Sequence, residues 1–205
     1  MQQSWRQDSD KLTFIVCQPL SRTINGDDDN GVREDDDASD KMLGDINLFL
    51  QIEEEEDEEE VNGETPKSSA AATPRIIGEV ELMIAEKKHH RKGFGRAALL
   101  SFFKYVSDHE DEILSEFASG DSVEATNLAA GDRSGLAFSC LTAKIGHANS
   151  KSLALFRSVG FQLVTDEPNY FGEFELRKTD LRPEAAGEAL KGNGITRYAE
   201  LAYRR

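Results

Sequence analysis

Residues 76–98 read Ile-Ile-Gly-Glu-Val-Glu-Leu-Met-Ile-Ala-Glu-Lys-Lys-His-His-Arg-Lys-Gly-Phe-Gly-Arg-Ala-Ala, and this stretch decides the fold. Its first part, from Ile76 to Ile84, is apolar and alternating, which predicts a strand. A basic connector follows, and from Phe94 onward apolar residues recur at the i, i+3, i+4 spacing of a helix. The stretch therefore predicts a strand, a short basic turn with two glycines, and a helix that begins near Phe94.

The junction between this strand and this helix is suited to a phosphate group. The first N–H groups of a helix have no intrahelical acceptor and carry the positive end of the helix dipole. Gly93 and Gly95 let the backbone approach an anion, and Arg91, Lys92 and Arg96 add full positive charges. An ordinary surface turn with positive charge is the alternative reading.

The same glycines also fit the dinucleotide-binding fingerprint, Gly93-x-Gly95-x-x-Ala98. That fold runs its strand almost directly into the first glycine and needs an acid about 20 residues later, at the tip of a second strand. Here eight residues separate Ile84 from Gly93, and the region near Ile113 is not strand-like. The spacing therefore disfavours a dinucleotide.

The net charge of −15 on this 205-residue chain is concentrated in two runs. Residues 27–40 contribute eight acids and one Arg, and residues 53–60 are eight acids in a row. The rest of the chain holds 23 acids and 23 bases, so it is close to neutral. Acidic runs of this kind are normally solvated and disordered, and they argue against a nucleic-acid ligand. An acidic segment that attracts a basic protein is the functional alternative.

The cysteines and histidines indicate no metal site and no disulfide framework. Cys17 and Cys140 both stand in apolar, strand-like runs, which predicts buried free thiols and suits a reducing compartment. The four histidines, at positions 89, 90, 109 and 147, show no metal-ligand spacing. No leader sequence and no run of about 18 apolar residues is present, so we expect neither secretion nor a membrane contact. A cytoplasmic location is expected, with nuclear entry left open.

The remaining segments complete an α+β pattern around a mixed sheet. Alternation predicts strands at 12–17, 42–50 and 138–145, and a hairpin over 161–176. Asn149 or Ser150 caps a helix that ends at Gly160. We expect acidic insertions at 21–41 and 53–75, a loop at 108–135, and a C-terminal extension at 179–205 with a short helix near 183–190.

Two motifs together resemble the GCN5-related N-acetyltransferase (GNAT) superfamily. Residues 90–95, His-Arg-Lys-Gly-Phe-Gly, resemble its motif A, Arg/Gln-x-x-Gly-x-Gly/Ala, with His90 at the first position. Residues 149–161, Asn-Ser-Lys-Ser-Leu-Ala-Leu-Phe-Arg-Ser-Val-Gly-Phe, are similar to motif B, Asn-x-x-Ser/Ala-x-x-x-Tyr/Phe-x-x-x-Gly-Phe. Taken alone, the second stretch is an ordinary amphipathic helix, but it lies one strand after the first motif. The resemblance implies a GNAT-like, mostly antiparallel sheet flanked by helices.

The resemblance narrows to the N-acetyltransferase 9-like branch, which is related to the ribosomal-protein alanine N-acetyltransferases. It is carried by Gln3-Ser4-Trp5 and by residues 10–16, 44–49, 78–86 and 143–146. In that family a strand, a helix and part of a second helix precede the Gln-Ser-Trp segment. We therefore expect a single acetyltransferase domain at 1–178, N-terminally incomplete, with one wall of its acceptor pocket missing.

Acetyl-CoA is the cosubstrate that the resemblance implies, without a metal. Motif A would bind the pyrophosphate, and the backbone of the preceding strand would pair with pantetheine or hold the thioester oxygen. The Tyr/Phe position of motif B, where many GNAT enzymes carry a Tyr that protonates the thiolate, is Phe156, which has no proton to donate. The implied cofactor-binding residues are Met83, Ile84, Arg91, Lys92, Gly93, Phe94, Gly95, Arg96, Asn149, Ser152 and Phe156.

The general base should be a carboxylate on the strand before the turn. Glu79 lies fourteen residues before Gly93, where several GNAT enzymes carry their glutamate base, and Glu81 shares its strand face by the two-residue period. A simple solvent-facing role for both, or a water-mediated proton transfer, stays open. Asp45, Asn47 and Glu173 are candidates for lining an acceptor site.

The sequence thus predicts an acetyl-CoA-dependent N-acetyltransferase that acts on a primary amine, a protein N-terminal α-amino group or a lysine. The alternative is a catalytically weak GNAT-like interaction module that uses its acidic insertions. His90 and Phe156 favour the module, whereas Gly93, Gly95 and Asn149 favour the enzyme. The expected partners are acetyl-CoA and a protein or peptide amine, with no nucleic acid and no membrane, and the oligomeric state stays open.

Overall fold

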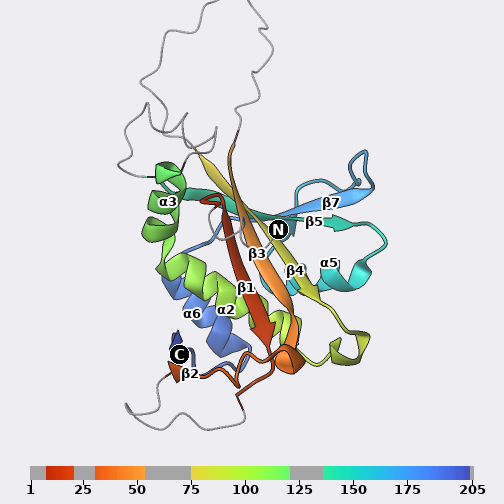
Figure 1. Cartoon of the computed structure of the whole chain (residues 1–205). Helices are drawn as coiled ribbons and strands as arrows, with labels where there is room; N and C mark the ends of the chain where they lie inside the picture. Colours follow the sequence, from red (N-terminus) through yellow and green to blue (C-terminus); the bar gives the residue numbers. More distant parts are fainter. Residues whose placement is uncertain (1–7, 21–30, 54–74, 121–135, 204–205) are drawn as a thin grey trace, which may run out of the picture.

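A computed structural model of the chain describes residues 8–20, 31–53, 75–120 and 136–203. Figure 1 shows its main feature, a long twisted sheet with helices packed against it. Trp5, the first ten residues of the expected insertion at 21–41 and most of the insertion at 53–75 lie outside the described residues.

Six strands form the main sheet in the order β1-β3-β4-β5-β7-β6. Only β4 and β5 run parallel, and the other neighbours are antiparallel, which confirms the predicted mixed, mostly antiparallel α+β fold. The strands are β1 (Lys11–Cys17), β3 (Met42–Ile52), β4 (Ile76–Ile84), β5 (Phe138–Gly146), β6 (Gln162–Leu163) and β7 (Glu173–Lys178). A second, two-stranded sheet pairs β2 (Gly31–Val32) with β8 (Ala202–Tyr203) in parallel.

The helices lie between and after the central strands. Because β4 and β5 are parallel, their connection must cross over the sheet, and two helices make that crossover. The helices are α2 (Phe94–Asp108), α3 (Glu110–Ser119), α5 (Ser150–Ser158) and α6 (Pro183–Gly192). Two short 3-10 helices, η2 (Ser39–Lys41) and η3 (Lys87–His89), stand just before β3 and just after β4.

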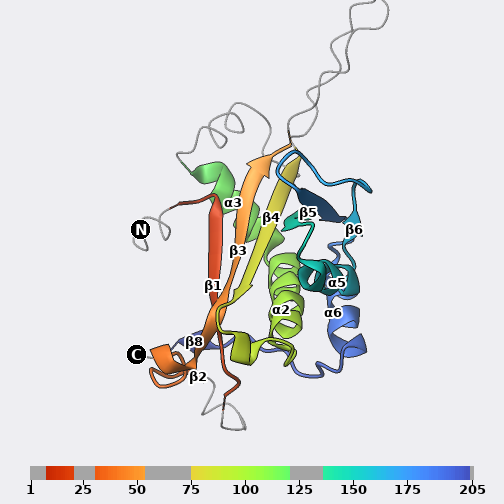
Figure 2. The same cartoon turned by 90° about the vertical axis from the view of Figure 1, so that its right-hand side faces the viewer.

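One face of the sheet is apolar and carries the core. Leu48, Val80 and Leu141 lie on neighbouring strands, and each is at most 2% exposed. Helix α2 packs Leu99 and Phe103 against this face, and Figure 2 shows α2, α5 and α6 together beside the strands. Burial of this apolar area is the main stabilising contribution to the fold.

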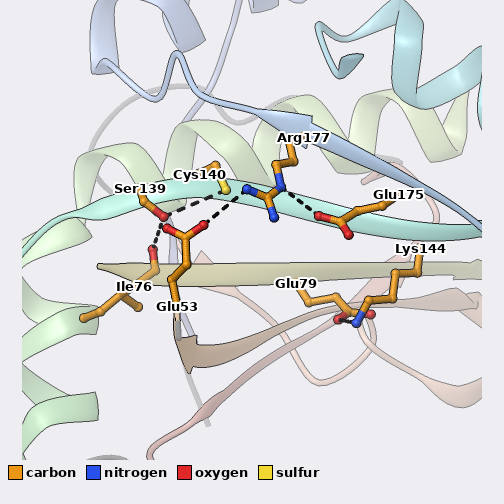
Figure 3. A network of polar contacts seen from close by, with 8 residues as sticks. All are labelled: Glu53, Ile76, Glu79, Ser139, Cys140, Lys144, Glu175 and Arg177. Carbon is orange, nitrogen blue, oxygen red and sulfur yellow. Dashed lines mark hydrogen bonds and ion pairs between the residues drawn. The ribbon is translucent and has the colours of Figure 1, made fainter. Parts of the chain in front are cut away.

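The opposite face of the sheet is polar. Because side chains alternate along a strand, the residues between the core positions share this second face. Figure 3 looks onto it, with the helices behind the strands. It carries Asp45 and Asn47 of β3, Glu79 and Glu81 of β4, Thr142 and Lys144 of β5, and Glu175 and Arg177 of β7.

The expected loop at 108–135 begins instead with a helix, α3. Ile113, Leu114 and Phe117 are spaced for one helix face and are at most 9% exposed, while three acids in the first turn favour the positive end of the dipole. Residues 121–135 lie outside the described residues. The insertion expected at 21–41 also contains ordered structure, because β2 and η2 fall within it.

The segment expected as a C-terminal extension packs onto the domain. Helix α6 lies against α2, with Leu190 only 3% exposed, and Ile195 and Tyr198 pack on the same core. The sequence signal was weak because the Gly-rich, charged residues around this helix hide a narrow apolar stripe. The fold therefore includes residues up to 203.

The described residues contain neither a membrane-spanning helix nor a metal-binding cluster. Among them, no helix is both long and apolar enough to cross a membrane. No group of three or more His, Cys, Asp or Glu residues in the same ranges is arranged to hold a metal ion. Cys140 is buried and Cys17 is half-buried, and both are free thiols.

Candidate active site

The parallel strands β4 and β5 separate halfway along their length. Their register runs from Ile76 opposite Phe138 to Glu79 opposite Thr142, and no pair follows. Strand β4 nevertheless continues to Ile84, where it is still paired with Gly44 of β3. The β4 edge at residues 80–84 thus has no strand partner on the β5 side within the described chain. An extended ligand can use this edge as a further strand would.

The splayed end of β4 leads into the basic turn and the N-terminus of α2. Gly93 is the N-cap, with a φ of 91°, and Arg91 also has a positive φ of 61°. An L-side chain at Gly93 would be strained in this conformation, although a Cβ there would meet nothing within 4 Å. The open space lies where the first N–H groups of α2 lack intrahelical acceptors. This is the geometry of an anion site.

Gly95 differs from Gly93 in its surroundings. A Cβ at Gly95 would lie 3.4 Å from Cδ2 of Leu155 and 3.5 Å from Cδ2 of Leu82. Both are ordinary van der Waals contacts, so Gly95 stands at an interface of α2, α5 and β4 that has room for a methyl group. It faces this packing interface, whereas Gly93 faces open space.

His90, which departs from the motif, ties the turn to the strand. Its Nε2 lies 2.7 Å from the carbonyl oxygen of Ile84, six residues earlier. This contact fixes the start of the turn against the end of β4. His90, which stands where the motif has Arg or Gln, therefore holds the turn against the end of β4.

Helix α5 brings motif B beside the α2 N-terminus. Asn149 caps α5, and its Oδ1 accepts a hydrogen bond from the Ser152 backbone N–H at 3.2 Å. The cap leaves the Nδ2 group of Asn149 able to donate to a ligand. Arg96 turns toward the end of α5, where its Nη2 lies 3.3 Å from Oγ of Ser158. Arg91 and Lys92 are exposed.

Phe156 lies in the core. It is 5% exposed and meets Phe161 edge to face at a centroid distance of 5.1 Å. It therefore offers little surface to a cofactor, and its effect on the site is to position α5. The side chain of Met83, in contrast, is 54% exposed on the polar face.

The two candidate bases differ in their surroundings. Glu79 is ion-paired with Lys144, whose Nζ lies 2.8 Å from Glu79 Oε2, and this contact raises the pKa of Lys144 (Figure 3). Partial burial, together with the negative charges of Glu79 and Asp45, raises the pKa of Glu81, while Lys144 partly offsets the shift. A carboxylate with a raised pKa is the better proton acceptor near neutral pH.

The structure thus gathers most of the predicted site around one gap. The start of α2, the end of β4 and the last turns of α5 lie together, and both carboxylates stand on the polar side of β4. The ion pair of Glu79 with Lys144 was not predicted, because it depends on the parallel register of two strands that are far apart in the sequence. The alternating pattern of β5 predicts which face of the sheet Lys144 lies on, but it does not predict which residue of another strand lies beside it.

A mixed sheet that splays beside a glycine-capped helix is the arrangement of GNAT acetyltransferases. No model of a known protein family matches the chain. An N-acetyltransferase 9-like protein of Schizosaccharomyces pombe, however, is 31% identical over 194 residues, which cover 86% of this chain and 73% of that protein. The chain therefore belongs to the N-acetyltransferase 9-like family of the GNAT superfamily.

Other relatives are matched over smaller shares of their length. The alpha/beta-tubulin-N-acetyltransferase 9 of Drosophila melanogaster is 36% identical over 117 residues, 57% of this chain and 45% of that protein. The Homo sapiens protein of the same name is 28% identical over 179 residues, 87% of this chain and 60% of that protein. Apart from the S. pombe protein, the chain spans between 35% and 62% of these curated relatives.

Solved structures give a weaker likeness. Arabidopsis thaliana NAA60 in complex with acetyl-CoA matches with a TM-score of 0.41 and 12% identity, covering 71% of this chain and 69% of that one. A domain from Methanocaldococcus jannaschii matches with a TM-score of 0.43 and 14% identity, covering 86% and 71%. At this level the likeness adds nothing to the assignment, which rests on the relatives above.

Proposed function

We propose that this protein transfers the acetyl group of acetyl-CoA to a primary amine of a protein. The observation that carries the proposal is the unpaired β4 edge, which leads directly to the open N-terminus of α2 and has carboxylates along its side. An extended pantetheine arm fits such an edge, and a pyrophosphate fits such a helix end. An interaction module has no need of either feature.

The residues of the turn fit acetyl-CoA. Gly93 leaves room beside the free N–H groups of α2, and the exposed Arg91 and Lys92 supply positive charge in the same turn. The Nδ2 group of Asn149 can donate to a carbonyl of the pantetheine arm. Acetyl-CoA supplies a thioester, whose carbonyl carbon is the atom that the amine attacks.

We assign the proton transfer to Glu81. Its raised pKa and its position two residues beyond the salt-bridged Glu79 favour it as the group that takes a proton from the acceptor's ammonium. The nitrogen then bonds to the acetyl carbon, the C–S bond breaks, and the sulfur leaves with the electron pair. The nitrogen loses its second proton to water as the amide forms, and the thiolate, to which Phe156 has no proton to donate, takes a proton from water.

The Ala85 N–H donates to the carbonyl oxygen of Leu43, so by alternation Met83 faces β3, whereas Leu82 and Ile84 face the gap. Backbone N–H groups on that free edge hold the thioester oxygen while its negative charge develops.

The acceptor we propose to test first is αβ-tubulin, because the Drosophila and human relatives carry tubulin in their names. A free amine on a protein N-terminus or on a lysine fits the acidic surroundings of Glu81. With tubulin as acceptor, the protein would act in the cytoplasm.

The experiment has two steps. Calorimetric titration of acetyl-CoA into the 205-residue chain should show binding in the micromolar range, where many enzymes bind their substrates. Labelled acetyl-CoA and tubulin should then yield acetylated tubulin, and mass spectrometry identifies the modified amine. A folded protein that binds no acetyl-CoA would support the interaction module instead.

A further inference from the structure

Asn47 has one unused hydrogen-bonding atom in a buried position. Its side chain is 6% exposed, and its Nδ2 group donates to Oδ2 of Asp45 at 2.7 Å. Its Oδ1 is buried without a hydrogen-bond partner in the described structure. The opposite amide orientation would bring this oxygen against a carboxylate, so the assignment of the two atoms is fixed. A buried acceptor without a partner costs about 1–3 kcal/mol, which calls for an explanation.

The register places this oxygen at the candidate active site. Asn47 is directly opposite Glu81, and Asp45 is directly opposite Met83, where β4 has left β5. Side chains at these positions share the polar face, so Asp45, Asn47 and Glu81 are neighbours across two strands. The unused oxygen therefore lies beside the carboxylate to which we assign the proton transfer.

The atoms around this point are hydrogen-bond acceptors with excess negative charge. Asp45, Glu79 and Glu81 are three carboxylates, and Lys144, their cationic neighbour, is ion-paired with Glu79. The nearby Thr142 also has a buried hydroxyl oxygen without a partner. A ligand that fits these groups carries positive charge and several N–H donors, which excludes anions. A metal ion is not favoured, because the described residues contain no group arranged to hold one.

We propose that Asp45 and Asn47 bind the protonated amino group of the acceptor and present it to Glu81. The inference rests on the proposed function and deepens it, because it names the chemistry by which the acceptor is held. An ammonium group has three donors, which match Asn47 Oδ1, an oxygen of Asp45 and an oxygen of Glu81. Charge-assisted hydrogen bonds of this kind are roughly twice as strong as neutral ones. When the ammonium binds, Asn47 Oδ1 gains a hydrogen-bond donor, and the positive charge of the ligand offsets one of the three carboxylate charges.

The test follows the amine without requiring transfer. Tri-alanine amide, which has a free α-amino group, is titrated into the ¹⁵N-labelled 205-residue chain, and the side-chain NH₂ signals of Asn47 are recorded. N-acetylated tri-alanine amide is the control, because it has the same length but no ammonium. We expect the Asn47 signals to shift with the free amine and to stay in place with the acetylated peptide. Equal shifts with both peptides, or none with either, would overturn the proposal.

Two variants sharpen the test. Asp45→Asn keeps an acceptor for the Asn47 Nδ2 group and removes the charge, so the dissociation constant of tri-alanine amide should rise about tenfold. Asn47→Leu removes the orphaned oxygen, so it should weaken amine binding without lowering the melting temperature. Glu116→Gln, on the exposed side of α3, is the charge-matched control and should leave the affinity unchanged. Unchanged affinity in Asp45→Asn, or loss of affinity only together with stability in Asn47→Leu, would contradict the assignment.

Acetyl-CoA binding and the rate of acetyl transfer, measured on the same samples, separate the two proposals. A chain that acetylates an amine but keeps its acceptor KM in Asp45→Asn would refute the amine site and leave the enzyme in place. A chain that binds no acetyl-CoA but binds the free amine through Asn47 would refute the proposed function and keep the amine site.

Discussion

Lys144 of β5 reaches Glu79 of β4 at the point where the two strands separate, with its Nζ 2.8 Å from Glu79 Oε2. The backbone register between these strands ends at Glu79 and Thr142, so the ion pair adds a side-chain link at the start of the gap. Glu81, two residues further along β4, has a raised pKa. Of these two carboxylates on one strand face, Glu79 therefore has a salt-bridge partner, and Glu81 is the one to which we assign the proton transfer.

Replacement of each carboxylate should separate these functions. Glu81→Gln should lower kcat by about a hundredfold, because a positioned base contributes roughly that factor or more. Glu79→Gln should lower kcat less than tenfold, because it removes a partner of Lys144 and not the proton acceptor. Steady-state kinetics measures both, and calorimetry should show acetyl-CoA affinity within about twofold of the wild type in each variant. A larger loss in Glu79→Gln than in Glu81→Gln would reverse our assignment.

The pH profile of kcat/KM should depend on the charges that face Glu81. Activity requires the Glu81 carboxylate, so it should fall as the pH decreases through the raised pKa of this group. Glu79 and Asp45 raise that pKa, and Lys144 lowers it. Lys144→Met should therefore move the acid limb to higher pH. Glu79→Gln should move it to lower pH, because it removes a negative charge and leaves Lys144 unpaired.

These opposite shifts distinguish an electrostatic effect from a packing effect. General damage to the site would lower the plateau in both variants without moving the limb in opposite directions. Rate measurements across the acid limb, with melting temperatures recorded at each pH, provide the comparison. Shifts in the same direction would show that another group titrates.

The local patterns of the sequence predicted most of the fold. The strand over Ile76–Ile84 was placed to the residue, because alternation and the following basic turn both mark its limits. The start of α2 at Phe94 was also predicted, because Gly93 and the helical spacing agree. Helix α3 was missed, because its three core residues are followed by a loop-like segment. Such cases show the limit of periodicity in short segments.

Side-chain partners between distant strands could not be predicted. The sequence put Glu79 and Glu81 on one face, but the partner of each depends on which strands become neighbours and in what register. Asn47 was a candidate for the acceptor site, yet its orphaned oxygen appears only when β3 and β4 are paired. The candidate site was thus predicted as a set of residue types, and the structure added the neighbours and hydrogen-bond partners of each residue.

Leu190 tests whether the C-terminal segment belongs to the domain. It is 3% exposed and packs into the core from α6, which lies on α2. Leu190→Ala should lower the free energy of unfolding by about 2–4 kcal/mol, because it removes buried methyl groups and leaves a cavity. Lys191→Ala, at the next, exposed position, should change it by less than about 0.5 kcal/mol. Denaturant unfolding measures both, and equal effects would indicate that α6 is a dispensable appendage.

Gly93→Asp should weaken acetyl-CoA binding at least tenfold. The substitution puts a side chain and a negative charge at the helix N-terminus where we place the pyrophosphate. It also strains the backbone, because φ is 91° at this position. Calorimetric titration of acetyl-CoA measures the loss. A control must therefore separate the effect of backbone strain on acetyl-CoA affinity from the effect of the added negative charge.

Gly194→Asp is the matched control for that strain. Gly194 also has a positive φ, of 77°, and a Cβ there would likewise meet nothing within 4 Å, but it follows α6 and is not part of the turn at residues 91–95. Both variants should lose about 1 kcal/mol of stability, since a left-handed conformation costs an L-residue roughly that much. Only Gly93→Asp should also lose acetyl-CoA affinity. Equal acetyl-CoA affinity in the two variants would show that the pyrophosphate does not bind at the α2 N-terminus. A loss of affinity in Gly93→Asp alone would show that it binds there and that the added charge, not the backbone strain, weakens binding.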